Sequence, residues 1–217
     1  FAGDTACCAT AICTNGLEVW SAGERICQQL LPRESLEQLI DVLYHLPRAG
    51  LVCFDGAQPI ICAGERDDLN EVFPAYARVA QLHDGLPDFS VLKANVFQVT
   101  DDAGTDELVA LLNERVEGLD FDKPMVGYTN IMPSGWNKGA AVTYLAAHLG
   151  VSLDEVVVFG DAGNDLTMFS VVENAVAVAN ATPEAAAAAR WHIGRCDEDA
   201  VAATIEQIVA GTWDPAA

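Results

Sequence analysis

The chain has 217 residues, of which 51% are hydrophobic, and its 32 acidic residues against 11 basic ones give a formal net charge of -21. That length suits one large domain or two small ones, and the hydrophobic content is sufficient for a buried core. The acidic balance argues against a nucleic-acid partner, because a protein that replaces the counterions of a phosphate backbone needs lysine and arginine.

Cysteine usage and hydropathy favour a cytoplasmic protein without a membrane partner. The seven cysteines are odd in number and form no C-x-x-C pair, so we expect reduced, mostly buried thiols. No apolar run approaches the roughly 20 residues that span a bilayer. The N-terminus has no basic region followed by an apolar one, so no signal peptide is expected. No feature predicts an oligomeric state.

The first part of the chain mixes strands and helices. Residues 1–16 end in the strand-like "TAICTNG". Strand pairs beside helices then predict an α+β module over residues 17–133. Its expected elements are a helix over 33–46, strands over 51–54 and 59–62 around an Asp-Gly turn, a helix containing Pro74, a strand over 94–100, a helix over 105–116 and a strand over 125–132.

From residue 138 onward the pattern alternates between helix and strand. We expect helices over 138–149, 164–172, 182–191 and 197–211, with strands over 155–159 and 175–179. Such alternation is typical of a parallel sheet covered by helices. The predicted fold is therefore α/β: a parallel-sheet core of residues 1–16 and 134–217, interrupted by the inserted α+β module of residues 17–133.

Two carboxylates and an amide follow the strand "VVVFG" in the sequence "GDAGND", residues 160–165. The helix that starts at Lys138 runs about 18 Å away from its start, and the strand over 155–159 returns about 16 Å. Lys138 and Asp161 should therefore lie side by side at the carboxyl edge of the sheet, where open α/β sheets bind ligands. Asp165, four residues on, can reach back over the same turn.

This group of side chains indicates a metal and phosphate site. Asp161 and Asp165 offer hard oxygen ligands, which suit a Mg²⁺ ion that keeps several waters and shares a phosphate. Asn164 adds a neutral donor and acceptor, and Lys138 fits the phosphate charge. The alternative is structural: the aspartates would cap a helix and Lys138 would be a surface charge.

The sequence "GDAGNDLTMF", preceded by "PSGWNKGAAVTYLAAHLGV" and followed by "AVAVANATPEAAAAAR", resembles the haloacid dehalogenase superfamily. The nearer resemblance is to its subclass IIB, the Cof-type and sucrose-phosphatase-like sugar phosphatases. It covers nearly the whole chain, with "AICTNG" similar to the strand that leads into the cap and residues 17–133 similar to the α+β cap. It implies a phosphatase of small phosphorylated metabolites, sugar phosphates first among them.

The resemblance also implies a role for each site residue. Asp161 would bind Mg²⁺, Asp165 would support the metal shell, and Asn164 would touch phosphate or metal-bound water. Lys138 would hold the transferred phosphoryl group and the nucleophile. Asn15 and Gly16 resemble the hinge into the cap, with a possible substrate contact.

The chain departs from the family at the nucleophile. The family carries D-x-D-G-T at the end of its first, central strand, where an aspartyl-phosphate forms. That motif is absent here, as is the phosphate-binding Thr or Ser of the next strand. Asp55 falls in a predicted hairpin turn, and no apolar strand precedes Asp4, so neither replaces it.

Two explanations for the missing nucleophile motif are open. The chain is a fragment whose first strands lie upstream, or it is a remnant that binds phosphorylated metabolites without catalysis. The first is favoured, because the family's first strand lies between strands retained here, and its loss leaves unpaired backbone groups inside a sheet. We therefore expect the nucleophile to lie outside this chain and the chain alone to be inactive.

Overall fold

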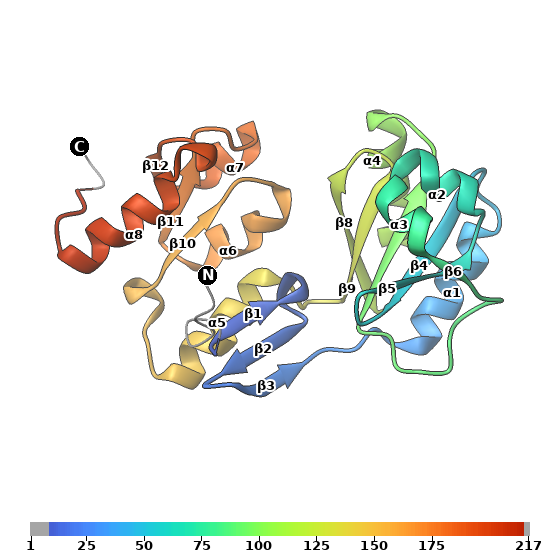
Figure 1. Cartoon of the computed structure of the whole chain (residues 1–217), viewed down its shortest axis with the longest axis horizontal. Helices are drawn as coiled ribbons and strands as arrows, with labels where there is room; N and C mark the ends of the chain where they lie inside the picture. The colour runs from blue at the N-terminus through green and yellow to red at the C-terminus, as the bar shows by residue number, and fades with distance from the viewer. Residues whose placement is uncertain (1–8, 215–217) are drawn as a thin grey trace. The chain divides into compact units, whose positions relative to one another are not determined.

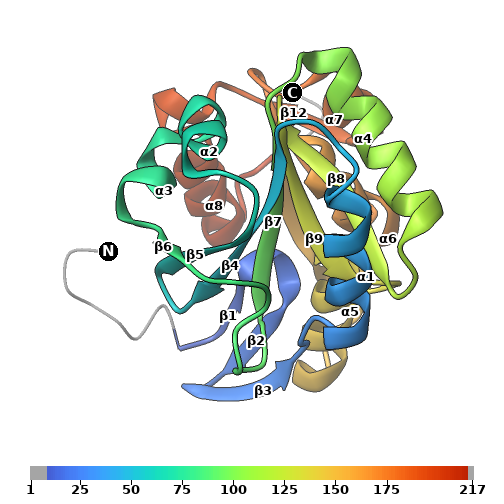
Figure 2. The same cartoon turned by 90° about the vertical axis from the view of Figure 1, so that its right-hand side faces the viewer.

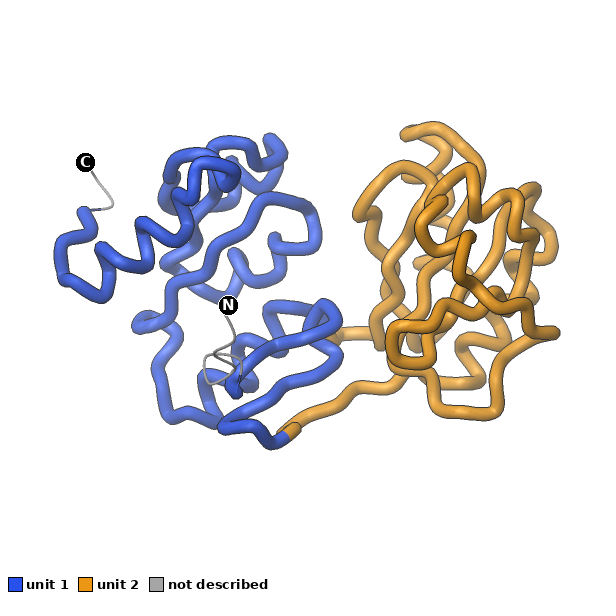
Figure 3. Tube along the Cα trace, in the orientation of Figure 1, with its two compact units in different colours: residues 1–24, 137–217 blue, residues 25–136 orange. Residues whose placement is uncertain are grey.

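The computed structural model describes residues 9–214, and the chain forms two compact units (Figures 1 and 3). Unit 1 comprises Phe1–Glu24 with Asn137–Ala217, and unit 2 is Arg25–Trp136. Residues 17–24, assigned to the cap from sequence, fall in unit 1. The physical reason is strand pairing: β2 (Glu18–Ser21) is the antiparallel partner of β1 (Ala11–Cys13).

Unit 1 contains the predicted parallel sheet, in the order β10-β11-β12. All its pairs are parallel, and Val158, Phe169 and Ala175 are among the residues of its core. Its elements from residue 137 onward are α5 (Lys138–Leu149), η3 (Leu153–Glu155), β10 (Val157–Gly160), η4 (Gly163–Asp165), α6 (Leu166–Val171), β11 (Asn174–Val178), α7 (Pro183–Ala188), β12 (Trp191–Ile193), η5 (Cys196–Glu198) and α8 (Ala200–Ala210).

The first strand differs from expectation. β1 does not join the parallel sheet but lies in a separate one, β1-β2-β3, where it pairs antiparallel with β2 and where β3 (Glu24–Gln28) spans the unit boundary. β1 is joined to β2 by η2 (Thr14–Gly16), so its nearest backbone partner is the strand that follows it. Within residues 9–214, the two sheets share no strand pairing.

Helix α5 contacts both parts of unit 1. It packs against β1, β2 and η2 on one side and against α6 and η4 on the other. Its predicted start and end are confirmed, with Gly150 as a left-handed C-cap. At Gly16, which has a φ of +104°, an added Cβ would lie 3.0 Å from the carbonyl oxygen of Asn137, so glycine allows the close approach of η2 to the start of α5.

Unit 2 is an α+β module built on a six-stranded sheet of order β6-β5-β4-β7-β9-β8. Its strands pair antiparallel except for β5 and β6, and helices cover both faces (Figure 2). Its elements are α1 (Arg33–Leu43), β4 (Ala49–Asp55), β5 (Gln58–Ala63), α2 (Arg66–Val72), α3 (Pro74–Val79), β6 (Gln81–Leu82), β7 (Lys93–Gln98), α4 (Asp102–Arg115), β8 (Leu119–Met125) and β9 (Tyr128–Pro133).

Each face of this sheet has its own core. Leu36 and Leu108, from α1 and α4, pack with Val96 of β7. On the opposite face, Leu69 of α2 packs with Phe97 and Tyr128. Because side chains alternate along a strand, the face of every residue on β7, β9 and the regular part of β8 follows from these clusters.

Several predicted boundaries in unit 2 change. The predicted strand over 125–132 is confirmed from Tyr128 onward as β9. Its first residues are not part of that strand, because Gly127 (φ +73°) turns the chain there and separates β9 from β8, which the sequence analysis missed. The predicted helix around Pro74 divides into α2 and α3, with the proline at the N-terminus of α3. The Asp55-Gly56 hairpin turn is confirmed, with Asp55 paired to Gln58.

The C-terminal elements and the thiols also differ in detail. The predicted helix over 182–191 ends at Ala188, and Trp191 begins β12, which pairs with β11. Of the five described cysteines, all free, only Cys53 and Cys62 are buried, so "mostly buried" is wrong for this part of the chain. None of the helices within residues 9–214 is long and apolar enough to cross a membrane.

Candidate functional site

The loop after β10 folds back on the end of its own strand. Gly160, the last residue of β10, makes this possible because an added Cβ would lie 2.6 Å from the Cβ of Asp165. The chain then turns through Asp161 and Ala162 into η4 and α6. The strand therefore ends in glycine at the point where an aspartate side chain must cross over it.

Asp165 is the buried centre of this loop, with 4% of its surface exposed. Its Oδ2 accepts hydrogen bonds from the backbone N–H groups of Asp161 (2.9 Å) and Ala162 (3.3 Å). Its Oδ1 accepts from the ammonium group of Lys138 at 2.6 Å. Both carboxylate oxygens thus accept hydrogen bonds, and Asp165 holds the lysine and the loop together. Its predicted support of a metal shell stays a prediction.

Lys138 reaches Asp165 from the first turn of α5. Asn137 caps this helix, since its Oδ1 accepts from the N–H of Ala140 at 3.0 Å. At the next position, Gly139 donates its N–H to Oγ1 of Thr167, and an added Cβ would lie 2.1 Å from the Thr167 carbonyl oxygen. The start of α5 therefore lies tightly against α6, which fixes where the Lys138 side chain begins.

Asp161 and Asn164 present the remaining polar groups of the loop. The Asp161 backbone is held by two bonds, one to Asp165 and one from the N–H of Thr182 to the Asp161 carbonyl oxygen at 2.8 Å. Asp161 is exposed, and its carboxylate has no hydrogen-bond or ion-pair partner among residues 9–214. Asn164 is half-buried in η4, next to Asp165.

The lengths of the predicted helix and strand indicated that Lys138 lies beside this loop. In the structure Lys138 contacts the loop. The direct contact is with Asp165 and not with Asp161. The sequence analysis also missed the supporting residues Thr167 and Thr182. Thr182 is the N-cap of α7, and its backbone bond to Asp161 depends on tertiary contact and leaves no sequence signal.

The loop after β10 offers few oxygen donors to a Mg²⁺ ion. Within the described residues, no group of three or more histidine, cysteine or acidic side chains could hold a metal ion. The exposed Asp161 carboxylate is one hard oxygen ligand, and Mg²⁺ often uses only one or two carboxylates together with waters and a substrate phosphate. The oxygen chemistry therefore fits Mg²⁺, with Asp161 as the ligand that this chain offers openly.

The hinge residues lie beside the same helix start. Asn15 (φ +55°) and Gly16 form η2, and Gly16 is buried against the carbonyl of Asn137, one residue before Lys138. Their predicted substrate contact stays a prediction. Asp55 lies in the hairpin turn of unit 2, and Asp4 lies outside the described residues.

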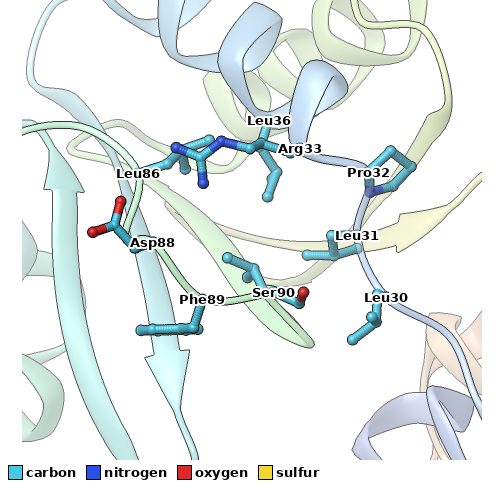
Figure 4. A pocket seen from close by; sticks show the side chains of 10 residues that line it. Leu30, Leu31, Pro32, Arg33, Leu36, Leu86, Asp88, Phe89 and Ser90 are labelled. Atoms are coloured by element: carbon cyan, nitrogen blue, oxygen red, sulfur yellow. The ribbon is translucent and has the colours of Figure 1, made fainter.

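Unit 2 has a pocket of about 230 Å³ at the start of α1 (Figure 4). Leu31, Leu36 and Phe89 are among its lining residues, and its charged residues are Arg33 and Asp88. The Arg33 guanidinium is already bonded to the Pro87 carbonyl oxygen (2.7 Å) and to Glu37 (3.1 Å). This pocket therefore lacks an uncommitted cation of the kind that binds phosphate.

The chain belongs to the haloacid dehalogenase-like hydrolase family. The sequence model of that family matches residues 2–205, which is nearly the whole chain. This confirms the resemblance read from the Lys138 and Gly160–Asp165 segments.

A curated relative resembles part of this chain in sequence, and two solved structures resemble it in fold. An HMP-PP phosphatase from Serratia proteamaculans is 39% identical over 74 residues, 33% of this chain and 27% of that protein. SMU.1108c from Streptococcus mutans UA159 has a TM-score of 0.78 at 21% identity, covering 90% of this chain and 75% of that one. The subclass IIB sugar phosphatase BT4131 has a TM-score of 0.73 at 17% identity, covering 94% and 76%. These structural likenesses support the fold.

Coverage of the relatives is partial. The aligned regions span between 20% and 38% of the length of the curated relatives, with 38% for the putative phosphatase of Haemophilus influenzae. The activity and substrate of the whole protein are therefore matters of proposal.

Proposed function

We propose that this chain provides the metal-binding and phosphate-binding residues of a Mg²⁺-dependent phosphatase. The enzyme would act on small phosphorylated metabolites in the cytoplasm. The observation that carries this proposal is the Lys138–Asp165 ion pair beside the exposed Asp161 carboxylate, at the carboxyl edge of the parallel sheet. A lysine that only adds charge to the surface needs no buried carboxylate to fix its position. A lysine whose ammonium group must contact a phosphoryl group needs one.

Each residue has a distinct task in this proposal. The Lys138 ammonium neutralises charge on the transferring phosphoryl group, and Asp165 fixes its position. Asp161 would hold Mg²⁺, with Asn164 bonding to phosphate or to metal-bound water. When bound, Mg²⁺ would supply Lewis-acid stabilisation of the phosphoryl oxygens.

The covalent step belongs to a carboxylate that residues 9–214 do not provide at this edge. In the family, an aspartate attacks phosphorus, the phosphate ester bond breaks, and water then hydrolyses the aspartyl-phosphate. The printed sequence has no D-x-D-G-T. We place the nucleophile outside this chain.

Sugar phosphates are the favoured substrates. The support is the family resemblance and the likeness of fold to a sugar phosphatase, which is an argument by analogy. Relatives described as HMP-PP phosphatases make HMP-PP the natural second compound to assay.

The second candidate function is a non-catalytic protein that binds phosphorylated metabolites. The missing nucleophile motif favours it. In that case, Lys138 and Asp161 would bind a phosphate and a cation without turnover.

Phosphate release distinguishes the two. The chain would be expressed alone and together with any in-frame sequence encoded upstream, then assayed on p-nitrophenyl phosphate, glucose 6-phosphate and HMP-PP. We expect no turnover by the chain alone, and Mg²⁺-dependent turnover, lost in EDTA, by the longer protein. Absence of an upstream D-x-D-G-T, with no turnover by either protein, would establish the non-catalytic function instead.

A further inference from the structure

The pocket at the start of α1 has two walls from segments that are far apart in the sequence. One wall is the segment that leads into α1, and the other is the loop between β6 and β7. Two hydrogen bonds join these walls. The N–H of Leu31 donates to the carbonyl oxygen of Val91 at 2.9 Å, and the Arg33 guanidinium donates to that of Pro87 at 2.7 Å. The pocket is therefore formed before any ligand enters it.

Most of the lining is apolar. Four of its side chains are almost fully buried: Leu31, Leu36, Leu86 and Val91. Leu30 also lines the pocket, yet 42% of its surface is exposed, so a hydrocarbon group placed here would remove apolar surface from water. The volume is about 230 Å³. Because an apolar cavity of about 150 Å³ accommodates benzene, this pocket can hold a six-membered ring with a short chain.

The charges of the pocket do not cancel. The Nε group of Arg33 donates to the Glu37 carboxylate at 3.1 Å, which offsets the positive charge. Asp88 is exposed, and its carboxylate has no hydrogen-bond or ion-pair partner among residues 9–214. In Figure 4, Asp88 and Leu30 lie at opposite sides of the pocket. The uncompensated charge is thus negative, which favours a cation and disfavours an anion.

The lining offers little to a sugar-like ligand. Besides Arg33 and Asp88, the described residues contribute one polar side chain to it, that of Ser90. Several hydroxyl groups placed against the apolar walls would lose their hydrogen bonds to water without gaining enough partners. The chemistry that fits is a hydrocarbon group with one cationic end.

We propose that this pocket binds a small organic amine, with its hydrocarbon group against the apolar walls and its ammonium group beside Asp88. The apolar walls supply most of the affinity, and Asp88 supplies the preference for a positive charge, since an exposed ion pair adds little binding energy. The inference is independent of the proposed phosphatase function, because every residue of the pocket belongs to unit 2 and none belongs to the Lys138–Asp161 site.

The test follows the backbone amide signals of Leu31 and Val91 by NMR in the ¹⁵N-labelled chain. Three probes share the phenylethyl group and differ in charge: phenylethylamine, phenylethanol and phenylpropionate. They are titrated at one ionic strength, because salt screens the attraction of any cation to an acidic protein. We expect the amine to shift both signals and to bind at least about threefold more tightly than the alcohol, with the carboxylate weakest. Absence of these shifts, or an amine that binds no more tightly than the other two compounds, would overturn the proposal.

The same loop offers a matched control. Asp84 is exposed, as Asp88 is, but it does not line the pocket. Asp88→Asn should bring the affinity for the amine down to that for the alcohol, whereas Asp84→Asn should leave the difference in place. Equal losses in the two variants would mean that the amine responds to the general negative charge of the protein and would contradict the assignment.

A second variant separates the apolar contribution from the charge. Leu30→Ala shortens an exposed side chain of the lining, so the fold should tolerate it. We expect it to weaken the amine and the alcohol by the same factor, at least about threefold, because both place the same hydrocarbon group in the pocket. Unchanged affinity for both compounds would show that they bind elsewhere.

Discussion

The Lys138 ammonium lies 2.6 Å from Oδ1 of Asp165, while Oδ2 of the same carboxylate accepts two backbone N–H bonds from the loop after β10. The pair is mostly buried, with 23% of the Lys138 side chain and 6% of the Asp165 side chain exposed. The Asp165 carboxylate thus joins the start of α5 to the end of β10. The loop after this strand is the one that the sequence predicted to be functional.

Lys138→Met should therefore affect stability as well as function. It leaves a buried carboxylate without its cation, although the two backbone amides remain, so we expect a loss of about 1–3 kcal/mol in the free energy of unfolding. Chemical denaturation of the two single variants and the double variant with Asp165→Leu checks this. The double variant should lose less than the sum of Lys138→Met and Asp165→Leu, and strict additivity would show that the pair is not coupled.

Gly160→Ala should destabilise the loop, because the new Cβ would lie 2.6 Å from the Cβ of Asp165 and 2.8 Å from its Oδ2. Overpacking of this kind costs about 1–3 kcal/mol. Gly163→Ala is the matched control in the same loop, since a Cβ there meets nothing within 4 Å. Thermal unfolding should separate the two variants, and equal melting temperatures would contradict the close approach of Asp165 to the strand.

The buried hydroxyl of Tyr128 should make unit 2 less stable at alkaline pH. Burial, with a smaller contribution from Tyr76, raises the pKa of its hydroxyl above the ordinary value of 10.0. Above about pH 10 the unfolded chain loses this proton while the folded chain keeps it, so stability falls as pH rises, by about 1.4 kcal/mol per pH unit from this group.

Tyr128→Phe should remove the loss of stability with rising pH that Tyr128 causes. At neutral pH it should leave stability unchanged or higher, because the hydroxyl has no partner among the described residues. Denaturation of both proteins between about pH 8 and 11 measures the difference. Parallel curves across this range would show that Tyr128 ionises normally in the folded chain.

Much of the core of unit 1 could be predicted from sequence because its signals are local. The Asn137 cap, the apolar spacing of α5 and Gly150 define one helix, and the β-branched run before Gly160 defines the next strand. Because adjacent parallel units return the chain to the same edge, the proximity of Lys138 to the Gly160–Asp165 loop followed from their lengths.

The rest depends on tertiary contact. The pairing of Lys138 with Asp165 rather than Asp161 is decided by a missing Cβ at Gly160 and by backbone amides, none of which a residue pattern reveals. β12 follows an alanine-rich helix and becomes a strand only because β11 is beside it. The pocket at the start of α1 likewise forms only where two segments meet that are far apart in the sequence.

Asp161→Asn should separate metal binding from folding. Its carboxylate is exposed and unpartnered within residues 9–214, so the melting temperature without Mg²⁺ should stay unchanged. Stabilisation by added Mg²⁺ should disappear. Asp154→Asn, at an exposed position in η3 ahead of β10, is the control and should retain the response. A loss in both variants would indicate non-specific cation binding to an acidic protein.

The most direct measurement is an NMR titration of the backbone amides with Mg²⁺ and inorganic phosphate together. If Lys138, Asp161 and Asp165 form a metal and phosphate site, the signals of Lys138 and of residues 160–165 should shift when both are present, and Asp161→Asn should abolish the shift. Shifts confined to other parts of the chain, or undiminished shifts in Asp161→Asn, would contradict the account.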